Sequence, residues 1–523
     1  MNKRHSIKKL GMSIFAIAAI PLAINTAVAE VDLTISSLPV ITDDCGDSRC
    51  QDRRQLTFEQ FKNLLADATN SNRQNATVNN NQSSSKKGRG LAVGQGNNDT
   101  QVVYLNFEQS SPTFQAVIGG NALTFVSHNY TQNERDLIQS NLEADYLGFN
   151  ISFTQQRPIT GEFSTLNFEC QSASGICINF GSGILFGQAQ SIDIQNQIRD
   201  DSAFVDAGLW EVLAQLDPSG ALLSNFSGIP VVNGDVQAAL STAIVNQASN
   251  TGAHELGHNL GLRHHDSFGS PGTGLPSTGT PSPDAFFPTF DGLQNGDEAI
   301  LHTMASGASV GSGLTDSTAR NRFFSERSVI KLAAAERGRL VDEHAVSGGN
   351  KKVKLHKVVA PNTVLEGDNS GGSLDIREAL IRGEITVANE LDRYRFTAKA
   401  GEVLSAEFNG FDVPVGERVI GALRLFKVEQ DGSETLIAQN FQNFEGFDAF
   451  LIDAALETTG DYVLEVSSPN VVSFGLDGNG QPILFALEEN GLGALRVGDY
   501  NLSIYMVDGK SGKGPGKVPG AGH

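Results

Sequence analysis

The stretch TGAHELGHNLGLRHHD, residues 251–266, holds four of the ten histidines in this 523-residue chain. In a helix, side chains four residues apart lie on one face, so His254 and His258 should point the same way. Two imidazoles at this spacing can share one metal ion, and neutral nitrogen ligands suit zinc. Glu255 can reach a water on the open side of such an ion. The stretch therefore predicts a helix that carries a metal site.

A catalytic zinc site needs three protein ligands and one open position. Six residues after His258 comes His264, and Gly261 between them is suited to end the helix in the left-handed conformation. The chain can then turn back and bring His264 to the same ion. The neighbouring His265 could take this place if the register shifted by one residue. We expect His264 to be the ligand and His265 to point elsewhere.

The segment HELGHNLGLRH, residues 254–264, resembles the signature of the metzincin zinc endopeptidases. Its first part, HELGHNLG, is similar to the reprolysin (adamalysin) branch of that clan. This branch has Asp directly after the third histidine, where the present chain has His265 and then Asp266. The resemblance implies three zinc ligands and one catalytic carboxylate, which are His254, His258, His264 and Glu255.

The resemblance also implies a Met-turn, a tight turn whose methionine lies beneath the metal. Met304, within ILHTMASG at 300–307, lies 40 residues after His264, where the clan places this turn. The chain has only four methionines, and this scarcity favours a Met-turn over ordinary core packing. We expect nearby His302 to be a satisfied loop histidine.

The net charge and the N-terminus bound the compartment and the partners. A formal net charge of -21 argues against nucleic acid as a partner, because such partners need a basic face. A basic start, an apolar run and small residues at Ala27 and Ala29 predict a signal peptide over residues 1–29. The apolar run is short for a membrane anchor, which is the alternative. We therefore expect a secreted or extracellular protein, or a periplasmic one, without a stable membrane anchor after cleavage.

The four cysteines form two local pairs, Cys45 with Cys50 and Cys170 with Cys177. In an exported chain, an even number at close spacing predicts two small disulfide loops. A cysteine zinc site is the alternative, but neither spacing fits it well.

Residues 30–97 are predicted to be a pro-segment or an N-terminal extension. They end in an Asn/Ser-rich stretch that is too polar to bury a core. Its basic cluster of Lys86, Lys87 and Arg89 suits proteolytic processing of a zymogen, although a simple linker would look the same. Some metzincins block zinc with a pro-segment cysteine, and the first cysteine pair could do so only if it is not a disulfide.

Residues 98–345 are predicted to form one α+β domain. A β-rich segment at 101–108 precedes a helical pattern at 134–149, and further helical patterns cover 236–262 and 322–340. The resemblance implies a metzincin-like catalytic domain with a mixed twisted sheet, an active-site helix, the Met-turn and a C-terminal helix. It also implies that an edge strand, around 183–192, aligns the substrate peptide.

The remaining chain is predicted to hold a linker at 346–375, an all-β sandwich at 376–508 and a disordered tail at 509–523. The sandwich resembles the bacterial pre-peptidase C-terminal domain through three segments. They are LDRYRFTAKAGEVL (391–404), TTGDYVLEV (458–466) and GDYNLSIYM (498–506). This domain could serve secretion, folding or substrate binding, or have a purely structural role.

Together these features predict a secreted zinc-dependent endopeptidase that acts on protein or peptide substrates. One zinc ion would activate a water, and Glu255 would take its proton and pass it to the leaving amine. The alternative is a non-catalytic binding or adhesion protein that retains a zinc site. Such a protein has no need for the Glu255 carboxylate. Structural calcium at FDGLQNGDEA, 290–299, stays open, because its spacing is not diagnostic.

Overall fold

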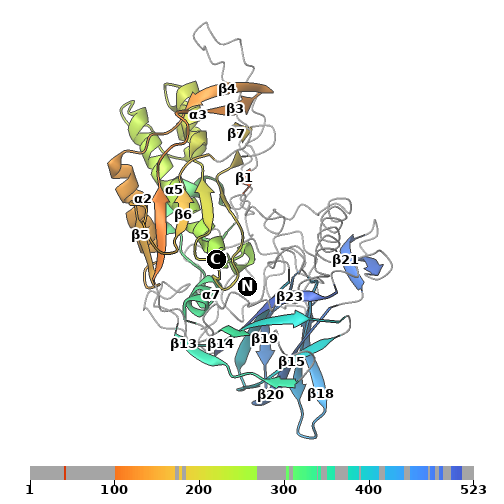
Figure 1. The fold of residues 1–523 in the computed structure, drawn as a ribbon. Helices are drawn as coiled ribbons and strands as arrows, with labels where there is room; N and C mark the ends of the chain where they lie inside the picture. Colours follow the sequence, from red (N-terminus) through yellow and green to blue (C-terminus); the bar gives the residue numbers. More distant parts are fainter. Residues whose placement is uncertain are drawn as a thin grey trace, which may run out of the picture.

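The computed structural model of the protein describes residues 41–42, 100–170, 176–179, 184–267, 302–305, 310–337, 340–342, 350–359, 375–387, 390–410, 419–440, 448–468, 471–476, 482–486 and 496–508. In these residues an α+β unit is followed by a two-sheet β-sandwich, and the two lie one above the other in Figure 1. The α+β class of the first unit and the β-sandwich class of the second are as predicted. The signal peptide, the basic cluster, the 290–299 segment and the tail lie outside the described residues, as does most of the N-terminal extension.

The α+β unit is built on a five-stranded sheet with the order β5-β2-β6-β10-β9. Four strands are parallel, and the end strand β9 runs antiparallel to β10. Three successive residues of β2 are buried, as expected for a strand covered on both faces. The strands are β2 Gln101–Asn106, β5 Ile151–Thr154, β6 Ser164–Asn167, β9 Gly187–Ala189 and β10 Ser202–Val205.

Helices begin where side chains cap their first turn. Thr131 and Glu134 form a capping box at the start of α2, Asp235 caps α5, and Ser325 accepts from the Ser328 amide at the start of α7. The 24-residue α5 packs against the sheet and against α2, and carries the histidine motif at its C-terminal end. The helices are α2 Gln132–Asp145, α3 Gly208–Leu216, α4 Ala221–Ser227, α5 Val236–Asn259 and α7 Glu326–Arg337.

Small sheets and short helices complete this unit. The β1–β8 pair is parallel, so two residues of the N-terminal extension lie beside the strand that leads into β9. Cys170 is disulfide-bonded, as predicted, and the side chains of the other three cysteines lie outside the described residues. The elements are β1 Ile41–Thr42, β3 Thr113–Ile118, β4 Asn121–Val126, β7 Ile176–Asn179, β8 Ile184–Leu185, η2 His264–Ser267, η4 Gly311–Leu314 and η5 Ala319–Asn321.

The sandwich consists of two sheets in which most neighbouring strands are antiparallel. The sheet that faces the α+β unit, called the inner sheet here, contains β11 Leu340–Asp342, β13 His356–Val359, β14 Asp375–Ile385, β16 Glu402–Asn409, β19 Ala449–Leu456 and β23 Gly498–Asp508. The outer sheet contains β12 Asn350–Lys352, β15 Leu391–Ala398, β17 Ala422–Val428, β18 Glu434–Asn440 and β20 Gly460–Ser467. A separate hairpin joins β21 Val471–Leu476 to β22 Pro482–Ala486.

The segment predicted as a linker contributes strands to the sandwich. Within 346–375, β12 pairs with β15 and β13 pairs with β14, while β11 joins the sandwich from the end of the predicted catalytic domain. The lysines of KKVKLHKVV, 351–359, give the segment a polar composition. Two of its valines are nevertheless buried, Val353 in the core between the two sheets and Val358 in the core shared with the α+β unit.

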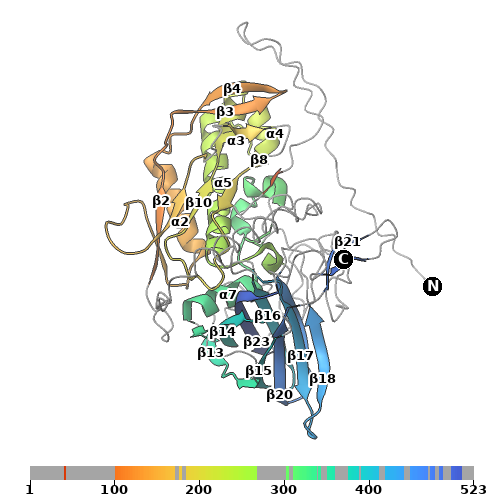
Figure 2. The same cartoon turned by 45° about the vertical axis from the view of Figure 1, so that its right-hand side comes forward.

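The inner sheet packs on both of its faces. On β16, Leu404 and Phe408 belong to the core between the two sheets, whereas Val403 belongs to the core shared with the α+β unit. Figure 2 shows α7 lying against β14, β16 and β23. The two units are therefore joined by a continuous apolar layer.

Across the described ranges, no helix is both long and apolar enough to cross a membrane.

Candidate metal centre

Three histidine side chains converge at the C-terminal end of α5. Nε2 of His254 lies 3.0 Å from Nε2 of His258 and 3.1 Å from Nε2 of His264, and all three residues are buried. One ligand atom from each lies within 4.8 Å of the others. The structure thus brings together the three histidines that the sequence predicts as metal ligands.

The end of α5 explains how the third histidine returns to the first two. Gly261 has φ of +92°, and the Leu262 amide donates to the Gly257 carbonyl at 2.9 Å. The Gly261 amide donates to the His258 carbonyl, also at 2.9 Å, which completes a Schellman cap. This reverses the chain direction, and η2 then begins at His264. The predicted role of Gly261 is confirmed.

Backbone carbonyls fix the orientation of two of the rings. His254 Nδ1 donates to Thr303 O at 2.8 Å, and His258 Nδ1 donates to Leu262 O at 2.9 Å. With the proton on Nδ1, each Nε2 presents its lone pair to the common centre. Burial, with His258 and His264 close by, lowers the pKa of His254 well below its usual value. The His254 ring is therefore held in the neutral form that binds metal ions.

The donor set fits a zinc ion. Three imidazole nitrogens on a tetrahedral zinc lie about 3.3 Å from one another, given a Zn–N bond of about 2.0–2.1 Å. The Nε2 of His254 lies 3.0 Å from that of His258 and 3.1 Å from that of His264, which is close to this spacing.

Glu255 projects from the same helical turn and is fully buried. Strand β9 lies directly against it, because a Cβ added to Gly187 would be 2.6 Å from Glu255 Oε1 and 2.5 Å from Thr251 Cγ2. The space for the carboxylate thus depends on a residue without a side chain. The predicted edge strand at 183–192 is two short strands, β8 and β9, and β9 ends the sheet.

Met304 lies against the helix between the two ligand positions. It is fully buried, and a Cβ added to Gly257 would be 2.5 Å from its sulfur atom. Its neighbour Thr303 provides the carbonyl that orients His254. The predicted Met-turn residue therefore contacts the metal-site helix. His302, expected to be a satisfied loop histidine, bonds to Ser267 O at 2.6 Å through Nδ1.

The motif did not point to the polar residues that surround the third histidine. Asp266 is buried, and its Oδ2 accepts from the Arg263 amide at 2.8 Å and from Lys331 Nζ at 2.8 Å. Burial disfavours the Lys331 ammonium, but Asp266 and Glu407 outweigh this effect and raise the pKa of Lys331 above its usual value. The only sign of this arrangement in the sequence is Asp266, which stands one residue later than the aspartate of the reprolysin branch. The His265 side chain lies outside the described residues.

Comparison with known proteins gives limited likenesses. No family model matches the chain, and no curated protein matches it. Among solved structures, the pre-peptidase C-terminal domain of a collagenase from Bacillus anthracis is similar to 30% of this chain over 95% of its own length, with 14% identity and a TM-score of 0.17. PliG from Aeromonas hydrophila, a periplasmic inhibitor of g-type lysozyme, matches 32% of this chain over 98% of its own length, with 14% identity and a TM-score of 0.17. At such TM-scores these likenesses carry no argument about fold or function.

Proposed function

We propose that this protein is a secreted zinc-dependent endopeptidase of the metzincin type. The observation that carries the proposal is the convergence of three buried imidazoles, His254 and His258 from α5 and His264 from η2, with Glu255 buried on the same turn of α5. The contact of Met304 with Gly257, between two ligand positions of the helix, supports it, because the clan is expected to place a methionine beneath the metal. His254, His258 and His264 would hold the ion.

The chemistry would divide between the ion and the protein. Bound zinc supplies Lewis acidity, which lowers the pKa of a water and polarises a peptide carbonyl. Glu255, next to a ligand in sequence but not itself a ligand, would accept the proton of that water and pass it to the leaving amine. Its burial excludes solvent from the carboxylate and strengthens its interaction with that proton.

Substrate alignment would use the end strand of the central sheet. Strand β9 lies against Glu255, and a peptide added to its edge would be held by main-chain hydrogen bonds. The pairing of β1 with β8, just before β9, supports the predicted latency, since Ile41 and Thr42 of the N-terminal extension then lie near this edge. A strand edge that binds a peptide main chain suits protein or peptide substrates, which an exported enzyme would meet.

The proposal is tested by casein hydrolysis with the purified full-length chain, its Glu255→Ala variant and a chelator-treated sample. Once its N-terminal extension is removed, the wild-type protein should hydrolyse casein, and the chelator should abolish this activity until zinc is restored. Glu255→Ala should lower kcat by about 10²–10⁴-fold because the general base is lost. The variant should keep one equivalent of zinc, because Glu255 is not a ligand.

Two outcomes would contradict the proposal. Full activity of Glu255→Ala would remove the assigned general base. Wild-type protein that binds zinc but hydrolyses no protein or peptide, even after removal of the N-terminal extension, would favour the non-catalytic binding protein instead.

A further inference from the structure

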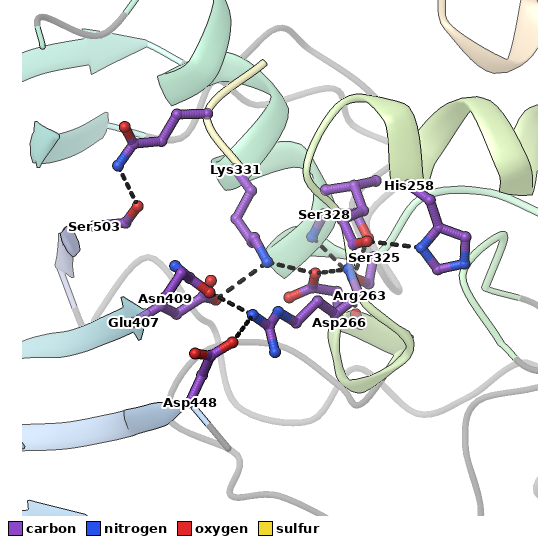
Figure 3. A network of polar contacts seen from close by, with 12 residues as sticks. His258, Arg263, Asp266, Ser325, Ser328, Lys331, Glu407, Asn409, Asp448 and Ser503 are labelled. Carbon is purple, nitrogen blue, oxygen red and sulfur yellow. Dashed lines mark hydrogen bonds and ion pairs between the residues drawn. The ribbon is translucent and has the colours of Figure 1, made fainter. Parts of the chain in front are cut away.

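The segment that carries the third histidine is attached to the sandwich as well as to α5 (Figure 3). Arg263 directly precedes His264, and its Nη2 donates to Asp448 Oδ2 at 2.8 Å and to Asn409 Oδ1. Asn409 ends β16, and Asp448 directly precedes β19, so both partners belong to the inner sheet. The metal segment therefore rests on a part of the chain that supplies no ligand.

A second attachment runs through Asp266. Its Oδ2 accepts from the Arg263 amide and from Lys331 Nζ of α7, each at 2.8 Å. Lys331 Nζ also lies 3.1 Å from Glu407 Oε1 of β16. The Asp266 carboxylate thus closes the short loop on itself and, through Lys331, connects it to the inner sheet.

These charges are out of contact with solvent. The side chains of Arg263 and Asp448 are 2% and 1% exposed, and the second oxygen of Asp448 accepts from the Gly410 amide at 2.8 Å. A buried ion pair is held to a narrow geometry, because any separation leaves both charges without solvation. The guanidinium therefore fixes the backbone immediately before His264.

We infer that the inner sheet of the sandwich is a positioning element of the metal centre. Arg263 and Asp266 act as positioning residues that hold His264 at the distance the other two ligands require, and Asn409, Asp448 and Glu407 supply the fixed support. This inference rests on the proposed zinc site. It gives the sandwich a role in the metal centre, although the sandwich lies far from the ligand motif in the sequence.

A simpler role would be adhesion between the two units, and the same interface offers a matched control. Arg327 of α7 donates from Nη1 to Asp453 Oδ1 of β19 at 3.1 Å, and its Nη2 bonds to the other oxygen. Both side chains are buried. This pair joins the same two units through α7 and β19, neither of which supplies a ligand.

The test uses the full-length chain with Arg263→Met, Asp448→Asn, Arg327→Met and His264→Ala. Zinc affinity is measured by competition with a chromogenic chelator, ligand geometry by the visible spectrum of the Co²⁺-loaded protein, and stability by thermal unfolding without metal. Arg263→Met and Asp448→Asn should weaken zinc binding by about 10- to 100-fold. Their Co²⁺ spectra should shift towards that of His264→Ala. Arg327→Met should lower the midpoint of unfolding but keep wild-type zinc affinity and spectrum.

The outcomes separate this inference from the proposed function. Wild-type protein that takes up no zinc would overturn the proposed function. Zinc-binding wild type with unchanged affinity in both Arg263→Met and Asp448→Asn would overturn the inference alone, as would an equal loss of affinity in Arg327→Met. If Arg263→Met does not fold, Asp448→Asn decides, because asparagine keeps the volume and an acceptor for Gly410.

Discussion

Gly187, in strand β9 of the central sheet, lies directly against the Glu255 carboxylate. An added Cβ would be 2.6 Å from Glu255 Oε1 and 2.5 Å from Thr251 Cγ2, so Gly187→Ala must displace side chains of α5. Displacement of a catalytic group by about 1 Å can cost about 10²-fold in rate. We expect kcat to fall about 10- to 100-fold with zinc affinity unchanged, as measured by peptide hydrolysis and metal titration.

Gly252→Ala is the matched control for this substitution. Its added Cβ would make only ordinary contacts, the nearest at 3.6 Å from Leu142 Cδ2. Alanine in place of a helical glycine should stabilise α5 by about 1 kcal/mol and leave kcat within about twofold. Wild-type kcat in Gly187→Ala would show that the carboxylate does not depend on this space.

At this scale the sequence predicted which residues converge but not what surrounds them. The spacing of His254, Glu255 and His258 follows from helical periodicity, and Gly261 indicates where the helix ends. The roles of Gly187 and Arg263 depend on segments far away in the chain. No local pattern encodes a contact with a strand edge or with a separate sheet.

The end of α5 sets the direction of the chain into the third-ligand segment. Gly261 has φ of +92°, and an added Cβ would lie 3.0 Å from the Asp193 carbonyl and 3.1 Å from the Gln195 amide, both backbone atoms. Gly261→Ala should therefore lower the free energy of unfolding by about 1–3 kcal/mol. It should also weaken zinc binding, which urea unfolding and metal titration would detect.

Gly401→Ala measures the cost of the left-handed backbone conformation alone, without the close backbone contacts that surround Gly261. Gly401 has φ of +89°, and no atom lies within 4 Å of its added Cβ. This variant should lose only about 1 kcal/mol and keep wild-type zinc affinity. Equal effects of both substitutions on zinc affinity would argue against a specific role for the turn after α5.

Helices were easier to predict than the strands that follow them. The predicted helix at 236–262 corresponds to α5, Val236–Asn259, because Asp235 caps its start and Gly261 follows its end. The helix predicted within 322–340 is α7, and Ser325 caps its first turn, as its place before Glu326 in the sequence indicates. The linker prediction misses β12 and β13 because both are short and lie in a segment with four lysines, and their pairing depends on the distant strands β15 and β14.

The whole molecule is joined by charges at the boundary between its two units. Lys331 is 7% exposed and lies between Asp266 and Glu407, both also buried. Lys331→Met removes the ammonium that both buried carboxylates contact, so the free energy of unfolding should fall by about 3–5 kcal/mol. Urea unfolding of the metal-free protein would measure this loss.

Lys357→Met provides the comparison at the surface. Lys357 pairs with Asp375 at 2.9 Å, and both side chains are 63% exposed. An exposed pair contributes about 0–1 kcal/mol, so this variant should unfold close to the wild-type midpoint. Equal losses in the two variants would mean that the Lys331 pairs are no stronger than a surface contact.

The sandwich class was predictable from short alternating segments, whereas its docking was not. Alternation on β16 indicates two faces, and Leu404 and Phe408 on one of them fill the core of the sandwich. The opposite face carries Glu407 and Asn409, which read in sequence as solvent-exposed polar residues. Their partners on the α+β unit could be identified only in three dimensions.

The separation of Arg263 and Asp448 in the chain has a consequence for synthesis. They lie 185 residues apart, and a ribosome makes Arg263 first. A chain still being made has all three histidines and Glu255 but not the sheet that supports the third histidine. Competence for metal binding would then come late, when nearly the whole polypeptide has left the ribosome. Under the proposed function, a growing chain would thus be least able to cleave proteins while it is still attached to the ribosome, among the proteins of its own cell.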